Sequence, residues 1–299
     1  MTTSIAPHKA GFVSIIGKPN VGKSTLMNRL VGERLAIITS KAQTTRHRIM
    51  GILNGEDFQV VYSDTPGILE PKYELHKSMM SFVRQSLEDA DLLLWVTDAY
   101  SNDNDEKDLI LPKLQGIETP VFLIINKTDL CTAEQVAIKR EFWANEYNFK
   151  AILPISAQIG TNTEDLFGLI LAEMPEHPAF YPKEDLTDRS ERFFAAEIIR
   201  EKIFLNYEQE IPYATEILIQ DFKVKDDMIV IRAEIIVERE SQKGIVIGKK
   251  GEALKKVGIQ ARQELEAFFQ KKIYLDQHVK VEKDWRKREL KLKHYGYHE

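Results

Sequence analysis

Eight consecutive residues near the amino terminus combine the types and spacing that bind a phosphate chain. They are Gly17, Lys18, Pro19, Asn20, Val21, Gly22, Lys23 and Ser24, and they fit the pattern of a glycine, four residues and then Gly-Lys-Ser/Thr. The glycines allow backbone amides to turn toward phosphate oxygens. The lysine supplies a cation for the β- and γ-phosphates, and the serine hydroxyl is a ligand for Mg²⁺. The stretch therefore predicts a nucleoside triphosphate site.

The flanking residues place this loop between a strand and a helix. Residues 12–16 are an apolar run that predicts a buried strand, and Thr25 opens a helix that continues to residue 30. A helix amino terminus presents unpaired amides and the positive end of a dipole, so it receives an anion. A chance glycine-rich turn would not need both flanks, which favours the phosphate site.

A second polar motif follows a later apolar run. Residues 58–63 are succeeded by Asp64, Thr65, Pro66 and Gly67. We expect the Asp64 carboxylate to hold Mg²⁺ through water and the Gly67 amide to sense the γ-phosphate. An Asp-x-Pro-Gly sequence is also an ordinary turn. Its place after a buried strand, about 40 residues beyond the phosphate loop, favours the functional interpretation.

A third motif indicates which base is bound. Asn126, Lys127 and Asp129 follow the apolar run 121–125. The Asp129 carboxylate can accept from both N1–H and the 2-amino group of guanine, a pair of donors that adenine does not offer. We expect Asn126 to bond N7 and brace the loop, and the Lys127 stem to lie over the base. The motif predicts GTP and GDP as ligands rather than ATP.

A shorter motif follows the last apolar run of the first half of the chain. Ser156, Ala157 and Gln158 come after residues 151–155. The Ala157 amide would donate to O6 of guanine and disfavour the amino group of adenine. Ser-Ala alone carries little information, so its position after a strand is what supports this assignment.

The apolar runs themselves predict the fold of the first half. Strands are expected at 12–16, 48–53, 58–63, 92–97, 121–125 and 151–155, and helices near 74–89, 104–115, 133–146 and 163–173. Asn54-Gly55 is a favoured two-residue hairpin turn, so the second strand should be antiparallel. We predict an α/β domain: a mostly parallel sheet with one antiparallel edge strand and helices on both faces.

A different pattern begins after a proline-rich stretch. Residues 175–187 predict a linker, and Asp188 with Glu191 predicts the cap of a following helix. Further elements are expected as strands at 215–222, 228–237 and 273–281, a turn at 225–227, a loop at 244–251 with a helix after it, and a basic helix at 285–290. The order α-β-β-α-α-β plus a tail predicts an α+β domain.

The amino-acid composition limits the classes of protein to which this chain could belong. The 299 residues are 43% hydrophobic and 29% charged, which is typical of a chain with two soluble domains. There is no apolar run of membrane-spanning length and no export signal, and the single Cys131 fits a reducing cytoplasm. The net charge is −12 over residues 1–238 and +7 over residues 239–299. The basic end favours an anionic partner, either nucleic acid or a membrane surface.

Residues 11–173 resemble the Ras-like GTPase domain in its translation-factor-related bacterial form. In that family a threonine in the loop after the first helix closes on Mg²⁺ and the γ-phosphate. The resemblance implies Thr45 in this role, with Thr44 as the alternative and an ordinary solvated loop as the competing interpretation. It further implies a Mg²⁺ site of Ser24, Thr45 and Asp64 and a catalytic set of Lys23, Thr45, Asp64 and Gly67.

One residue departs from the signalling members of that family. Ile68 follows Gly67, where many of them place the glutamine that orients the attacking water. Isoleucine cannot hydrogen-bond water, so we expect slow intrinsic hydrolysis. Relatives with an apolar residue here recruit a partner or a potassium ion. Asn20 matches the asparagine that helps to hold potassium, so K⁺ is a hypothesis beside Mg²⁺.

The second domain resembles the type II KH fold in its order of elements. A Gly-x-x-Gly loop between two helices clamps the backbone of single-stranded nucleic acid in KH domains, whereas the same loop alone is more often a helix-capping turn. The RNA-binding residues implied are Lys243, Gly244, Ile247, Gly248, Lys249, Lys250, Gly251 and Lys255. Lys256 and Arg262 add positive charge next to them.

A Ras-like GTPase domain joined to one type II KH domain resembles the Era family, over nearly the whole chain. Stretches that carry the resemblance include residues 197–202, 211–213 and 240–248. The resemblance implies a GTPase that acts in assembly of the small (30S) ribosomal subunit, binds the 3′ end of 16S ribosomal RNA, contacts the inner membrane peripherally and is a monomer. It implies a cytoplasmic protein with these parts: a tail (1–10), a GTPase domain (11–174), a linker (175–187), a KH-like domain (188–283) and a basic tail (284–299).

Two other functions remain open from the sequence. The basic carboxyl terminus also fits a membrane-recruited regulatory GTPase for which RNA is not the primary ligand. Ile68 also fits a scaffold that binds GTP without hydrolysing it. In the favoured interpretation, GTP orders the loops around Thr45 and Asp64 and so changes how the KH domain is presented. Hydrolysis of GTP then reverses this change.

Overall fold

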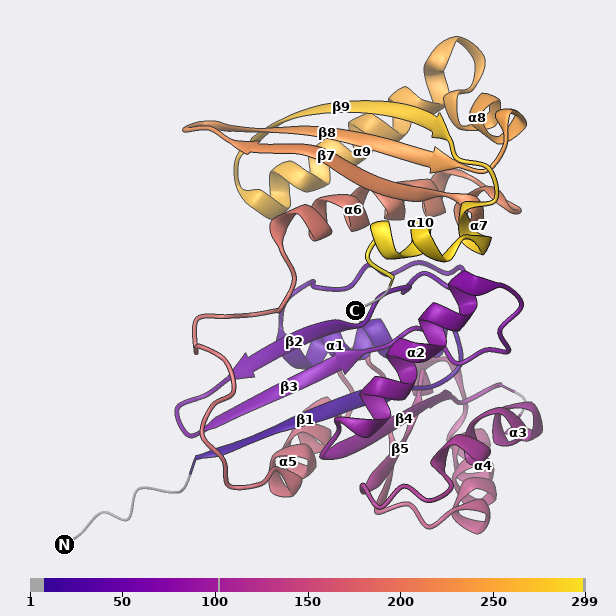
Figure 1. The fold of residues 1–299 in the computed structure, drawn as a ribbon. Coiled ribbons are helices and arrows are strands. Elements are labelled where there is room, and N and C mark those ends of the chain that lie inside the picture. The colour runs from indigo at the N-terminus through magenta and orange to yellow at the C-terminus, as the bar shows by residue number, and fades with distance from the viewer. Residues whose placement is uncertain (1–7, 102, 298–299) are drawn as a thin grey trace, which may run out of the picture. The chain divides into compact units, whose positions relative to one another are not determined.

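A six-stranded sheet forms the centre of the first half of the protein (Figure 1). The computed structural model describes residues 8–101 and 103–297. It divides into one unit containing residues up to Ala36, Thr45–Pro71 and Met79–Asp188, and a second containing Ile37–Thr44, Lys72–Ser78 and Arg189 onward. Residues 1–7, within the predicted amino-terminal tail, and residues 298–299 lie outside the described part.

The strands of the first sheet run in the order β2-β3-β1-β4-β5-β6. Their bounds are β1 Lys9–Ile16, β2 Ile49–Asn54, β3 Phe58–Asp64, β4 Leu92–Asp98, β5 Val121–Asn126 and β6 Ala151–Pro154. Only the β2–β3 pair is antiparallel among these neighbours. The predicted sheet with one antiparallel edge strand is confirmed.

Helices cover both faces of this sheet, as the unbroken burial of its central strands requires. They are α1 Lys23–Val31, α2 Glu74–Glu88, α3 Asp103–Leu114, α4 Ala133–Glu146 and α5 Thr163–Glu173. All seven residues of β4 and all six of β5 are buried. Figure 1 shows α1 and α2 on opposite faces. The carboxyl ends of the parallel strands meet at one edge, where each polar motif begins.

The hairpin turn between β2 and β3 differs from the prediction. Asn54 is still part of β2 and pairs with Gln59, so the two-residue Asn54-Gly55 turn is wrong. The chain reverses between Gly55 and Phe58, whose carbonyl accepts from the Gly55 amide at 2.9 Å. Gly55 does not have the positive φ that a two-residue turn of this type needs.

The stretch predicted as a linker lies along the free edge of β2. The Ile52 amide donates to the Leu186 carbonyl at 2.9 Å, and Thr187 forms an isolated bridge with Gly51. Asp188 accepts from the Met50 amide at 3.2 Å and does not cap the next helix. The cap is Ser190, whose side chain accepts from the Phe193 amide, so the predicted Asp188 cap is wrong. Aspartate and serine are both suited to cap a helix, but here the Asp188 carboxylate is bonded to the Met50 amide at the edge of the sheet.

The second unit contains a three-stranded sheet with helices against it. Its elements are α6 Glu191–Asn206, α7 Ile211–Ala214, β7 Glu216–Val224, β8 Met228–Val237, α8 Glu240–Ile247, α9 Glu252–Phe269, β9 Lys272–Val281 and α10 Glu289–His294. β7 pairs antiparallel with β8, and β9 pairs parallel with β8. The predicted order of elements is confirmed. The core consists of alternate residues of β8, such as Ile231, Ala233 and Ile235, packed with α6 and α9 residues.

Two local predictions in this unit are wrong. Residues 244–247 belong to α8, so the predicted loop 244–251 begins only at Gly248. The predicted helix 285–290 is a short 3₁₀ turn, Trp285–Lys287, followed by α10. Trp285, Leu292 and Tyr297 are fully buried, and the terminal stretch belongs to this unit.

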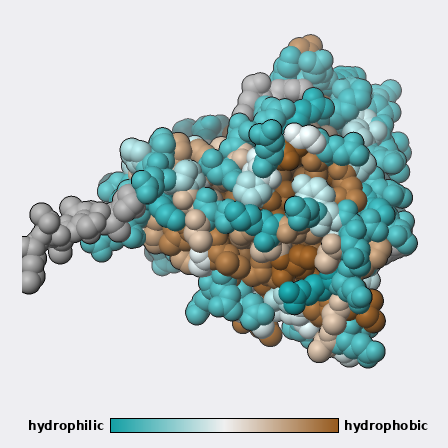
Figure 2. Space-filling model, turned by 90° about the horizontal axis from the view of Figure 1, so that it is seen from below, coloured by the Kyte–Doolittle hydropathy of each residue, from teal (hydrophilic) through white to brown (hydrophobic). Residues whose placement is uncertain are grey.

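The surface carries mostly polar residues with some apolar ones. In the face drawn in Figure 2, hydrophobic residues gather at the centre and hydrophilic ones surround them. Apolar atoms contribute much of any folded surface, so this pattern alone marks no site. Among the described residues, no helix is both long enough and apolar enough to cross a bilayer.

Candidate functional site

The phosphate loop connects β1 to α1 at the carboxyl edge of the sheet. Gly22 precedes α1 with a φ of 98°, and a Cβ there would lie 2.3 Å from Nδ2 of Asn126. Glycine is therefore required at this position. The Lys23 ammonium folds back over the loop and donates to the carbonyls of Gly17 at 3.2 Å and Lys18 at 2.8 Å. The backbone thus holds this cation next to the helix amino terminus, where an anion is favoured.

Burial disfavours the charged forms of Lys23 and Asp64 when no ligand is bound. It lowers the pKa of Lys23 to about 8, although Asp64 and Glu106 oppose the shift. It raises the pKa of Asp64 to about 6, against the opposing effects of Lys23 and of hydrogen bonds from Ser24, Thr45 and the Thr65 backbone. A phosphate chain with a divalent cation would supply the missing charge for both groups.

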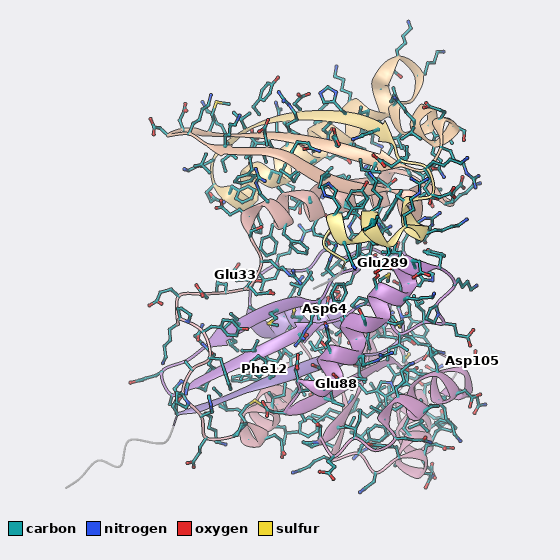
Figure 3. The ribbon with its side chains drawn as sticks, viewed as in Figure 1. Phe12, Glu33, Asp64, Glu88, Asp105 and Glu289 are labelled. Carbon is teal, nitrogen blue, oxygen red and sulfur yellow. The ribbon has the colours of Figure 1, made fainter. Side chains whose placement is uncertain are left out.

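Three oxygen-bearing side chains converge beside the loop. Asp64 lies at the end of β3 (Figure 3), and its Oδ2 accepts from the Ser24 hydroxyl at 2.5 Å and from the Thr45 hydroxyl at 3.4 Å. The Ser24 and Thr45 hydroxyl oxygens are 2.9 Å apart. Thr44 instead bonds Thr39 and the Lys41 carbonyl, so the geometry favours Thr45 over Thr44 as the Mg²⁺ ligand.

The chemistry of this group fits Mg²⁺. The cation prefers hard oxygen ligands and is held by few protein groups together with phosphate and water. Oδ1 of Asp64 is buried and has no hydrogen-bond partner among the described residues. The same residues contain no cluster of three or more histidine, cysteine or acidic side chains that could hold a metal by themselves. Ser24, Thr45 and Asp64 would therefore hold Mg²⁺ jointly with a nucleotide.

The second motif touches the phosphate loop through its backbone. The Ile68 amide donates to the Gly17 carbonyl at 3.0 Å, and a Cβ on Gly67 would lie 2.6 Å from the Pro19 nitrogen. The Thr65 hydroxyl donates to the Ile15 carbonyl at 2.8 Å and fixes the start of the motif on β1. The Ile68 side chain is fully buried in the apolar core. Position 68 therefore supplies no polar group to a water.

Asn126 forms hydrogen bonds that link the phosphate loop to the loop after β6. Its Nδ2 donates to the Val21 carbonyl and its Oδ1 accepts from the Ala157 amide, both at 2.9 Å. The Ser156 hydroxyl donates to Asp129 at 2.5 Å, which orients the carboxylate predicted to read guanine. The structure thus brings the third and fourth motifs to the phosphate loop.

Three residues of this site were not predicted from the sequence. Arg29 on α1 donates to the carbonyls of Ala157 and Gln158, at 3.2 and 2.7 Å, and so braces the loop that follows β6. Asp98 ends β4, Tyr100 lies two residues beyond it, and both contact the Lys127 ammonium. Asp98 ends a buried strand just as Asp64 does, and that signal could have identified it.

The Gly-x-x-Gly loop of the second unit lies between α8 and α9. Gly248 has a φ of 73°, and a Cβ there would approach the Ala253 Cβ to 2.6 Å. Lys249 and Lys250 are exposed on a 3₁₀ turn, Lys249–Gly251. Beside the loop is a groove of about 380 Å³ lined by Gly251, Leu254, Lys255, Gly258, Ile259, Arg262, Leu275 and Gln277. Of the predicted RNA-binding residues, Gly251 and Lys255 line it, whereas Lys243, Gly244 and Ile247 lie on α8.

Comparison with known proteins identifies both domains. A model of the family described as 50S ribosome-binding GTPase matches residues 12–127, and a KH domain model matches residues 210–286. The GTPase Era of Geobacter metallireducens is 44% identical over 97% of this chain and 98% of its own. The chloroplastic GTPase ERA-like protein of Oryza sativa subsp. japonica is also 44% identical, over 99% of this chain and 71% of its own. The chain belongs to the Era family of GTPases.

Solved Era structures have the same fold. An Aquifex aeolicus Era variant bound to GDP and AlF₄⁻ gives a TM-score of 0.91 at 41% identity, over 97% of this chain and all of that one. An Era complex with MgGDPNP and nucleotides 1506–1542 of 16S ribosomal RNA also gives 0.91 at 41% identity, over 98% of this chain and all of that one. The predicted family and fold class are therefore confirmed.

Proposed function

We propose that this protein is a GTP-hydrolysing switch that binds the 3′ end of 16S ribosomal RNA during assembly of the 30S subunit. The observation that carries the proposal is the combination of a guanine-nucleotide site with a Gly-x-x-Gly groove on one chain. A related structure at 41% identity is an Era complex with both MgGDPNP and a 16S ribosomal RNA segment.

In hydrolysis, the loop amides and Lys23 would bind the phosphate chain and stabilise the charge that develops on the γ-phosphoryl group. Mg²⁺, held by Ser24, Thr45 and Asp64, would neutralise part of the phosphate charge when bound. The Gly67 amide would hold a γ-phosphate oxygen, so loss of that group would release the second motif. Asp129 would exclude adenine nucleotides. The Ala157 amide donates to Asn126 Oδ1 in this structure, so it would have to exchange that hydrogen bond to reach O6 of guanine.

Slow intrinsic hydrolysis is part of the proposal. No hydrogen-bonding side chain stands at position 68, since Ile68 is packed in the core. A partner such as RNA or the 30S subunit, or K⁺ held with the help of Asn20, would then supply the missing stabilisation. Equal single-turnover rates in sodium and potassium buffers would remove K⁺ from the proposal.

RNA would meet the groove beside Gly251 with its bases and the exposed Lys249 and Lys250 with its phosphates. The presence of the two sites on one chain motivates coupling between them, so that GTP and GDP states differ in RNA affinity. A cytoplasmic monomer, with a peripheral membrane contact through the basic carboxyl terminus, completes the proposal. The alternative is a membrane-recruited GTPase that does not need RNA.

The deciding experiment measures binding of a labelled 3′-terminal 16S ribosomal RNA segment by the full chain, with a GTP analogue and with GDP. We expect binding that weakens steeply with salt and is lost in Gly248→Asp. Vesicles of anionic lipid are the parallel arm, because lipid binding has no need of Gly248. Equal RNA affinity in both nucleotide states would remove the coupling, and vesicle binding without RNA binding would support the alternative. Single-turnover hydrolysis with and without 30S subunits separates the enzyme from a scaffold.

A further inference from the structure

The ammonium of Lys127 is fixed by two groups outside the four nucleotide-binding motifs. Its Nζ donates to the Tyr100 hydroxyl at 3.0 Å and lies 3.5 Å from Oδ2 of Asp98. The centre of the Tyr100 ring is 5.2 Å from Nζ. Since the hydroxyl oxygen is much nearer than the ring centre, the hydrogen bond is the main contact and the attraction of the ring is secondary.

The segment that carries Tyr100 is itself braced. The Glu106 carboxylate on α3 accepts from the hydroxyls of Thr97 at 2.7 Å and Ser101 at 3.2 Å. Lys139 on α4 donates to the Ser101 hydroxyl at 3.0 Å. These contacts lie on both sides of Tyr100 in the chain. The tyrosine therefore projects from a fixed support.

The same segment is attached to the strand that delivers Lys127. Asp98 is the register partner of Asn126 in the β4–β5 pair, and the Ala99 amide donates to the Asn126 carbonyl at 3.0 Å. Lys127 follows with a φ of 62°, which turns the chain out of β5. The backbone that carries Tyr100 is thus attached to the backbone that leads to Lys127.

A free lysine side chain has many rotamers, and fixing one on ligand binding costs conformational entropy. Holding the ammonium in advance removes much of that cost from the binding step. Tyr100 is 57% exposed, so its hydroxyl acts from the solvent side and leaves the Lys127 stem free to cover a base.

We propose that Tyr100 is a positioning residue for the bound guanine nucleotide. It holds the Lys127 ammonium through its hydroxyl, with Asp98 as the second acceptor, so that the lysine stem stays against the base and nucleotide release is slowed. This inference rests on the guanine-nucleotide site proposed at Asn126, Lys127 and Asp129.

The test is the dissociation rate of a fluorescent GDP from the full chain, measured by stopped flow for wild type and Tyr100→Phe. The variant removes one hydrogen bond and keeps the ring. We expect dissociation to become about threefold faster, a size typical of one partly exposed hydrogen bond to a charged group. Tyr147→Phe, at a tyrosine on the loop between α4 and β6, is the matched control and should match wild type.

A second measurement separates positioning from a general structural effect. In a Lys127→Met background the ammonium is absent, so Tyr100→Phe should produce no further change in the dissociation rate. An unchanged rate in Tyr100→Phe, or an equal increase in both backgrounds, would overturn the inference. If wild type failed to bind guanine nucleotides at all, the proposed function would fail instead.

Discussion

Replacement of Asp64 by asparagine should stabilise the nucleotide-free protein while it destroys the Mg²⁺ site. Burial raises the pKa of this carboxyl to about 6 from an ordinary value of 3.8, and its Oδ1 has no partner among the described residues. A displacement of about two pKa units corresponds to about 3 kcal/mol of native-state penalty above pH 6. That shift already includes the opposing attraction of Lys23, so the net gain on replacement by asparagine should be about 3 kcal/mol.

The sign of the effect with pH follows from the direction of the shift. The native state binds the Asp64 proton more tightly than the unfolded chain does, so the penalty is absent below pH 3.8 and grows until about pH 6. The advantage of Asp64→Asn should therefore be full at pH 7.5 and largely gone near pH 4.5. For a unit of this size, about 3 kcal/mol raises the unfolding midpoint by about 8 °C.

The assay is thermal unfolding of nucleotide-free protein at pH 7.5 and pH 4.5, followed by Mg²⁺-dependent GTP hydrolysis. Asp108→Asn, on the exposed face of α3, is the control and should leave both readouts near wild type. A lower midpoint for Asp64→Asn at pH 7.5 would show that the ionised carboxylate stabilises the empty site, and the reasoning from burial would be wrong. Hydrolysis that survives the substitution would refute the assignment of the Mg²⁺ site.

Thr45→Ala should slow single-turnover GTP hydrolysis by about 100-fold, whereas Thr44→Ala, whose hydroxyl bonds Thr39 and the Lys41 carbonyl, should change it less than threefold. The reverse ranking would assign the role to Thr44. Glu106→Ala should lower the free energy of unfolding by about 3 kcal/mol in denaturant titrations, because it removes the acceptor of the buried Trp95 indole N–H and leaves the Thr97 hydroxyl with only two longer contacts of 3.4 Å; a loss under 1 kcal/mol would contradict this. Gly248→Asp should weaken RNA binding at least tenfold, through a strained φ and an added negative charge, without changing GTP hydrolysis; an RNA affinity equal to wild type would exclude the loop.

The sequence predicts helices and strands correctly where the spacing of apolar residues and a neighbouring motif indicate the same element. Alternate residues from 229 to 237 are all apolar, and residues 228–237 form β8 with the predicted bounds. Ser24 and Asp64 converge as expected, because Asp64 ends β3 and the loop that leads to Ser24 leaves the same end of the neighbouring parallel strand β1. The choice between Thr44 and Thr45 could not be made, since adjacent threonines in a loop have no period that says which one points inward. The hydroxyl contacts of the folded chain are needed to distinguish them.

The other errors of the prediction also come from contacts between residues that are far apart in the sequence. Asp188 and Ser190 are both good helix caps, and only the position of Met50 at the sheet edge determines that the aspartate is used elsewhere. Tyr100 was missed because its role depends on a contact with Lys127, 27 residues away, that no local pattern records. Arg29 was missed for the same reason, since its carbonyl partners follow β6.

The contact of residues 186–188 with β2 determines which fragments of the protein would keep the edge of the first sheet covered. The outer edge of β2 would otherwise present unpaired amides, such as those of Met50 and Ile52, that invite pairing with a second chain. A fragment that stops at residue 174 would uncover this edge and should associate through it, whereas one that ends after Asp188 keeps it closed. The opposite edge has less need of such cover, because β6 is only four residues long and ends in Pro154. Residues 186–188 therefore form an outer border of the sheet and should limit self-association of the first unit.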